Sequence, residues 1–135
     1  MLRTFAAIIA GQFTIIIING FCRLAIAAYL GIEISLSGIS TLPSFTWKAI
    51  IVGMSLFYGT IGGLVTCIIA DGSYKTEILS LIVIVVATAL FDYQYVNTEE
   101  SIWYFITNTG LTIAGLFLGY RLLLKKDQIA KIVRN

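Results

Sequence analysis

The segment Ile102–Leu124, IWYFITNTGLTIAGLFLGYRLLL, decides the fold of this chain. It is long enough to cross the hydrocarbon core of a bilayer as a helix, which takes about 20 predominantly apolar residues. The aromatic pair Trp103 and Tyr104 stands at one end, and Arg121 near the other is followed by the basic segment 125–135. Aromatic residues are typical of membrane interfaces, and basic residues collect on the cytoplasmic side. The segment therefore predicts a membrane helix whose C-terminal end faces the cytoplasm.

The composition of the whole chain agrees with a membrane location. Of the 135 residues, 59% are hydrophobic and 12% are charged, and the mean hydropathy is +0.95. Soluble domains are roughly half apolar and about a quarter charged. The length allows further crossings of about 20 residues each with short connections, which leaves no room for a soluble domain. We therefore predict an all-α integral membrane four-helix bundle that forms a single domain over residues 1–135.

Apolar stretches mark the expected helices. They cover residues 4–31, 47–70, 76–95 and 102–124, and residues 125–135 form a basic cytoplasmic tail. The first stretch resembles a signal peptide at Ala25-Ile26-Ala27, but its apolar run exceeds the roughly 7 to 15 residues of a signal-peptide core, so we expect a retained helix. Residues 33–46 have the composition of a loop. The tail is either an amphipathic extension along the inner interface or a solvated helix end.

Basic residues set the expected orientation. Those expected on one side are Arg3, Lys75, Arg121, Lys125, Lys126, Lys131 and Arg134. The other side has Lys48 and Arg23, accompanied by the acidic residues Glu33, Asp92, Glu99 and Glu100. Short loops rich in Lys and Arg remain in the cytoplasm. Both termini are therefore expected in the cytoplasm, and the basic residues are expected to contact lipid headgroups rather than nucleic acid.

Small residues indicate where helices pack. Gly59 with Gly63, and Gly115 with Gly119, have the spacing that lets helix backbones approach closely in lipid. We expect these glycines to pack against other helices, either in this chain or in a partner. The faces that carry small or polar residues are Ser55, Gly59, Gly62 and Thr66 on the second helix, Asn108, Thr112, Gly115 and Gly119 on the fourth, and a weaker set, Ser80, Ala87 and Phe91, on the third.

Polar residues interrupt the apolar helices. Gln12, Asn19 and Arg23 lie within about 40° of one another on the first helix and so form one stripe. With Asn108 and Thr112, the two amides Gln12 and Asn19 either line a permeation path or form hydrogen bonds between helices. No charged residue is expected near the midplane of any helix, whereas proton-coupled transporters usually need one there.

Arg23 and Asp92 form the charge pair that we single out. Asp92 lies about 22 Å along the third helix from Glu77, a depth that the long side chain of Arg23 can reach. The pair is either a structural clamp between the first and third helices, which is the commoner case, or the mouth of a path for ions or solutes. Glu33 competes as a partner for Arg23.

The residue types present in the sequence exclude most kinds of catalytic site. Histidine is absent, and we find no phosphate-binding glycine loop, no nucleophile with a base, and no paired carboxylates on one face. Cys22 and Cys67 are expected near opposite ends of the bundle, where they serve as small hydrophobic residues rather than as a disulfide. We therefore predict no catalytic, cofactor-binding or metal-binding residue, no cofactor, and no enzymatic activity.

Three segments support an architectural resemblance. They are Arg3-Thr4-Phe5-Ala6-Ala7-Ile8-Ile9-Ala10-Gly11, the end of the second helix at Ala70-Asp71-Gly72, and the close of the last helix at Gly119-Tyr120-Arg121. In this layout the chain resembles small four-span bacterial membrane proteins of uncharacterised families. The resemblance implies a location in the bacterial inner membrane and no assigned activity.

Two functions fit these observations. The first is a non-enzymatic accessory or structural subunit that contacts other transmembrane helices, in a homo-oligomer or a larger membrane complex. The alternative is a small oligomeric channel or transporter lined by Gln12, Asn19, Asn108 and Thr112. The two differ in whether these side chains face a hydrated interior or are satisfied by neighbouring helices.

Overall fold

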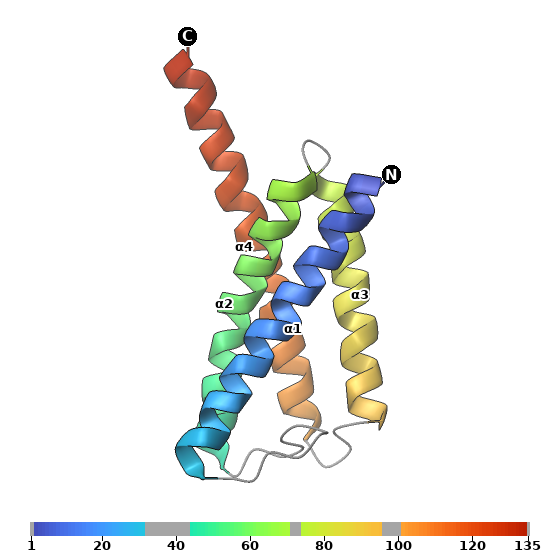
Figure 1. The fold of residues 1–135 in the computed structure, drawn as a ribbon, viewed down its shortest axis with the longest axis vertical. Helices are drawn as coiled ribbons and strands as arrows, with labels where there is room; N and C mark the ends of the chain where they lie inside the picture. The colour runs from blue at the N-terminus through green and yellow to red at the C-terminus, as the bar shows by residue number, and fades with distance from the viewer. Residues whose placement is uncertain (1, 32–43, 71–73, 96–100, 135) are drawn as a thin grey trace.

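The computed structural model confirms the predicted all-α, four-helix fold (Figure 1). It describes residues 2–31, 44–70, 74–95 and 101–134, with the side chains of the last range described as far as Lys126. The helices are α1 (Leu2–Leu30), α2 (Phe45–Ala70), α3 (Tyr74–Tyr95) and α4 (Ile102–Arg134). Within these ranges there is no strand. Most of the predicted loop 33–46, and with it Glu33, lies outside the described residues.

All four helices are long and apolar enough to cross a membrane. Large apolar side chains such as Phe13, Phe21, Val83 and Ile106 are exposed on the outside of the bundle. In water such a surface would be unstable, whereas in a bilayer it faces lipid of the same polarity. The chain is therefore an integral membrane protein.

Helix α4 continues beyond its predicted end at Leu124. Its apolar span closes at Lys126, but the helix itself runs to Arg134 and extends past the other helices (Figure 1). After Gly119 the chain contains neither glycine nor proline, and Leu, Lys, Gln, Ala and Arg are all good helix formers. The charged residues thus end the apolar span and not the helix.

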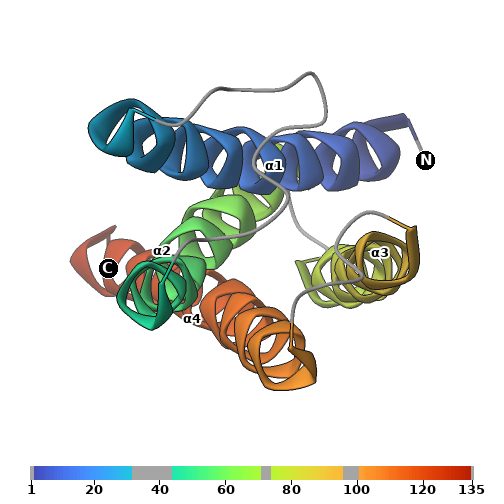
Figure 2. The same ribbon diagram turned by 90° about the horizontal axis from the view of Figure 1, so that it is seen from below.

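Helix α2 lies between α1 and α4 and makes the most extensive contacts with both. Helix α3 makes much smaller contacts with the other three. The view along the bundle shows α2 between α1 and α4, with α3 standing apart at their open side (Figure 2). Helices α1 and α4 therefore pack closely on α2, and α3 is more loosely attached to this unit.

The structure places the four predicted packing glycines in the contact between α2 and α4. A methyl group at Gly59 would overlap the backbone of Thr112, and one at Gly63 would lie 2.7 Å from the carbonyl oxygen of Leu116. In return, Gly115 and Gly119 lie against the backbone of α2. Backbone therefore meets backbone along this glycine contact, because glycine removes the side chains that would separate the helices.

The contact between α1 and α2 uses a further glycine that the sequence analysis did not single out. A side chain at Gly11 would overlap Thr66, and Gly62 packs against Ile15. Together with the glycine contact, these residues make α2 a helix with small residues on two sides. This explains why α2 occupies the centre of the bundle.

The weaker set on α3, which includes Ala87 and Phe91, does not mark the face that packs inside this chain. Ala87 and Phe91 are exposed, and the buried residues of this helix are instead Glu77, Ile78, Leu81 and Val85. Leu81 and Val85 join Ile15, Tyr58 and Leu116 in an apolar cluster. Because α3 has no glycine, its contacts are made by large aliphatic side chains, and small residues do not mark its inner face.

Candidate functional site

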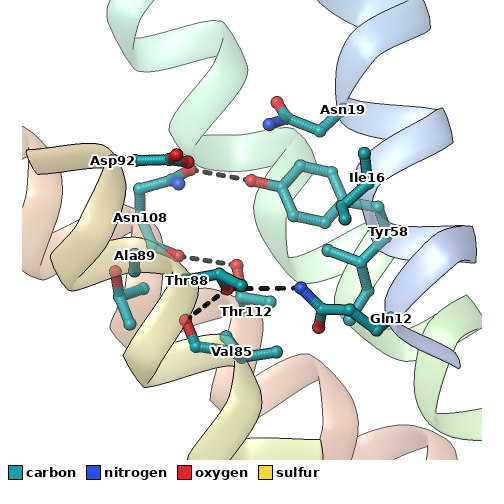
Figure 3. Close-up of a pocket in the computed structure, with 12 residues that line it drawn as sticks. Gln12, Ile16, Asn19, Tyr58, Val85, Thr88, Ala89, Asp92, Asn108 and Thr112 are labelled. Atoms are coloured by element: carbon teal, nitrogen blue, oxygen red, sulfur yellow. Dashed lines mark hydrogen bonds between the residues drawn. The ribbon is translucent and has the colours of Figure 1, made fainter. Parts of the chain in front are cut away.

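A polar pocket of about 250 Å³ lies between α1, α3 and α4, with one side formed by α2 (Figure 3). Its lining residues are Gln12, Ile15, Ile16, Asn19, Tyr58, Val85, Thr88, Ala89, Asp92, Asn108, Thr109 and Thr112. The four residues predicted as a polar lining are all among them. The structure therefore brings together polar groups that stand far apart in the sequence.

The pocket follows from the uneven packing of the helices. Glycines bring α2 close to α1 and α4, whereas α3 makes only small contacts with its neighbours. The space that remains beside α3 is lined by the polar stripe of α1 and by the polar turn of α4. A second cavity beside α3, about 260 Å³ in volume and lined by Lys75, Ile78, Leu79, Phe117 and Tyr120, lies toward its other end.

Tyr58 is one of the lining residues that the sequence analysis missed, together with Thr88. It is almost completely buried near the middle of α2, and its hydroxyl donates a hydrogen bond to Oδ1 of Asn108 at 2.9 Å. A buried tyrosine generally requires such a partner. Tyr58 falls on the same helix face as Ser55 and Gly59, so its position beside the predicted small-residue face was a usable signal.

The two amides of α1 are only partly satisfied. Nε2 of Gln12 donates to Oγ1 of Thr88 at 3.2 Å, whereas the amide oxygens of Gln12 and Asn19 are buried without a hydrogen-bond partner. Leaving a buried acceptor unpaired costs about 1–3 kcal/mol. Contacts between helices thus use only part of the hydrogen-bonding capacity of these side chains.

Arg23 and Asp92 meet at one end of the polar pocket. A smaller pocket of about 70 Å³ adjoins it and is lined by both residues, together with Asn19, Tyr104 and Asn108 among others. The two charges are close enough to interact electrostatically, and Arg23 also donates a hydrogen bond to the hydroxyl of Tyr104 at 3.0 Å. Arg23 therefore connects α1 to α4, in addition to lying near the carboxylate of α3.

The pocket opens to the outside of the bundle on the side of α3. Thr88 and Asp92 both line it, and both are exposed. Their place in an apolar helix puts polar groups on a surface that is otherwise suited to lipid. This exposed polar edge is a second unusual feature of the site.

Glu77 is a buried carboxyl group outside the polar pocket. It is 2% exposed, one of its oxygens accepts a hydrogen bond from Thr4 at 3.1 Å, and the other has no partner. The sequence analysis used Glu77 only as the point from which the depth of Asp92 is counted, and gave it no role. Its distance from the pocket makes it a useful reference for experiments on Asp92.

The pocket does not resemble a metal centre or a hydrolytic site. Among the described residues, no group of three or more His, Cys, Asp and Glu side chains could hold a metal ion. Asp92 is the only acidic residue in the polar pocket, and both Cys22 and Cys67 are free thiols away from it. What the lining offers is hydrogen bonding and one negative charge.

No family model matches the chain, and no curated protein or solved structure matches it either. The resemblance to small four-span membrane proteins therefore identifies no family. It stands only as a statement of architecture, a four-helix protein with four candidate membrane spans.

Proposed function

We propose that the protein is a small, non-enzymatic membrane protein that binds a polar solute in the polar pocket, as a carrier or channel does. One observation carries the proposal: polar side chains from all four helices converge on one cavity, and two of their amide oxygens have no partner. Polar groups that serve only to join helices satisfy one another. Groups with unused capacity beside a cavity are suited to a ligand.

The position of the pocket agrees with solute binding inside a membrane. Tyr58 lies near the middle of its helix, and Asp92 lies toward the end of α3. The cavity thus extends from the centre of the bundle toward one membrane face. The small contacts of α3 support the proposal further, because a loosely packed helix is the element that can move to admit a solute.

We place the protein in the bacterial inner membrane with both termini in the cytoplasm. The N-terminal end of α1 and the C-terminal end of α4 lie at the same end of the bundle (Figure 1). Arg3, Lys75 and Lys126 belong to that end. This distribution supports a cytoplasmic assignment for it, and then the Arg23 and Asp92 end of the pocket faces outward.

Cysteine labelling tests the proposal. In a protein with Cys22 and Cys67 replaced by alanine, Asn108→Cys places a thiol in the pocket, and Leu116→Cys places one in the fully buried apolar cluster. In proteoliposomes, a small water-soluble methanethiosulfonate reagent should label Asn108→Cys and leave Leu116→Cys unlabelled. Equal protection of both thiols would show that the pocket is dry and would overturn the proposal.

An accessory subunit is the second candidate, and the exposed polar edge favours it. A helix from a partner would cover Thr88 and Asp92 and remove them from lipid. The glycines no longer support this function, because Gly59 and Gly115 are used within the chain. Native mass spectrometry of gently extracted protein separates the two candidates: a heteromer of defined stoichiometry indicates a subunit, and a homo-oligomer or monomer agrees with a carrier.

A further inference from the structure

We infer that the solute is a small organic cation with N–H donors, of the primary ammonium class. The inference rests on the proposed function, since it names the chemistry of the ligand for the same pocket. It follows from the direction of the hydrogen bonds in the lining and from the one charge among the lining residues.

Three hydroxyl groups of the pocket, those of Thr88, Thr112 and Tyr58, have already used their protons. Thr88 donates to backbone carbonyls one turn earlier in α3, and Thr112 donates to the carbonyl of Asn108 at 2.8 Å. Tyr58 donates to the side chain of Asn108. Because a hydroxyl has one proton and two lone pairs, these groups can offer a ligand only acceptors (Figure 3).

The amides of the lining carry both acceptors and donors. Nε2 of Gln12 is engaged with Thr88, while the amide oxygens of Gln12 and Asn19 have no partner. The side-chain oxygen of Asn108 is occupied by Tyr58, which leaves its amino group as a donor. The hydroxyl oxygens of Thr88, Thr112 and Tyr58 remain able only to accept, and a ligand that carries N–H donors matches them.

The charged groups of the lining also favour a cationic ligand. Asp92 is the only acidic residue among the lining residues of the polar pocket. Arg23 interacts with Asp92 from the adjoining smaller pocket, where it also donates to Tyr104, and no basic residue lines the polar pocket itself. The ring of Tyr58 also lies beside the cavity, and an aromatic face attracts cations.

The volume limits the size of the ligand. A cavity of about 250 Å³ has room for roughly eight water molecules at about 30 Å³ each. A compound of a few heavy atoms fits with part of its hydration shell. Ethanolammonium, ethylene glycol and glycolate are suitable probes, since they are of similar size and differ mainly in charge.

Ligand-observed NMR titration of the full chain in nanodiscs tests the inference. We expect ethanolammonium to bind about tenfold more tightly than ethylene glycol, and glycolate to bind more weakly than either. Asp92→Asn, which keeps the shape of the side chain, should remove that tenfold preference for ethanolammonium over ethylene glycol. The matched control is Glu77→Gln, which removes a carboxylate outside the pocket and should leave the preference intact.

The alternative outcomes have separate meanings. Tighter binding of ethylene glycol or glycolate would overturn the cationic class and leave solute binding standing. Potassium ions that bind as tightly as ethanolammonium and displace it would overturn an organic ligand in favour of an inorganic one. If no probe binds, the inference fails, and labelling of Asn108→Cys decides independently whether the proposed function fails with it.

Discussion

Helix α4 meets its neighbours in two very different ways. Toward α2, Gly115 and Gly119 bring backbone against backbone, with no side chain between the helices. Toward α1 and α3, Asn108 and Thr112 face a cavity whose polar groups are partly unpaired. The two regions adjoin, because the backbone of Thr112 packs on Gly59 while its side chain lines the pocket. The comparison shows that glycine spacing decides where this bundle closes and where it leaves a cavity.

The largest effect is expected from a bulky residue in the glycine contact. Gly63→Leu would insert a side chain where even a methyl group would lie 2.7 Å from the carbonyl oxygen of Leu116. We expect it to lower the free energy of unfolding by more than about 3 kcal/mol or to prevent folding. Thermal unfolding in detergent measures this change. Gly53→Leu is the control, since no atom lies within 4 Å of the equivalent position, and an equal loss for both variants would contradict the close contact.

A smaller loss is expected at the contact between α1 and α2. Gly11→Ala would force its methyl group against Thr66 and should lower the free energy of unfolding by about 1–3 kcal/mol. Gly20→Ala lies on the same helix in open space and should be neutral or stabilising by up to about 1 kcal/mol, because alanine favours a helix. Chemical denaturation of the two variants side by side gives the difference, and identical curves would argue against a close approach at Gly11.

The hydrogen bond between Tyr58 and Asn108, where the pocket adjoins the glycine contact, should contribute less to the free energy of unfolding. Tyr58→Phe removes the donor to Asn108 and should reduce the free energy of unfolding by about 1 kcal/mol. Tyr95→Phe removes a hydroxyl from an exposed tyrosine that keeps its ring contact with Phe91, and it should have no measurable effect. The melting temperatures of both variants test this, and an unchanged value for Tyr58→Phe would show that the hydrogen bond adds nothing.

The smallest effect has the opposite sign and separates stability from binding. Asn19→Leu replaces a side chain whose amide oxygen is buried without a partner. We expect it to raise the free energy of unfolding by up to about 1 kcal/mol, because a buried acceptor without a partner is removed. The same variant should lose binding of ethanolammonium. Melting temperature and NMR titration on one sample measure both, and a variant that is less stable would contradict the unpaired state of Asn19.

The fold was predictable because the bilayer imposes it. Apolar runs of about 20 residues with aromatic and basic ends allow few structures other than membrane helices. The polar lining was predictable in part for the same reason, since amides such as Gln12 and Asn19 stand out in an apolar helix. Their convergence on one cavity was not, because it depends on how far each helix lies from its neighbours.

Three features were missed for identifiable reasons. The inner face of α3 was missed because this helix is aliphatic on every side, so its sequence distinguishes no face. Tyr58 was missed because tyrosine is usually assigned to membrane interfaces, whereas here its hydroxyl finds a partner in the bundle centre. The length of α4 was missed because charge ends an apolar span without ending a helix.

The order of the helices along the chain has a consequence for biosynthesis. Helices α2 and α4 make the most extensive contact, yet α3 separates them in the sequence. Because synthesis proceeds from the N-terminus, Gly59 and Gly63 enter the bilayer before Gly115 and Gly119 exist. During that interval the face of α2 that carries Gly59 and Gly63 has no partner helix from its own chain. The most extensive helix contact of the bundle can therefore form only after the last helix has been synthesised.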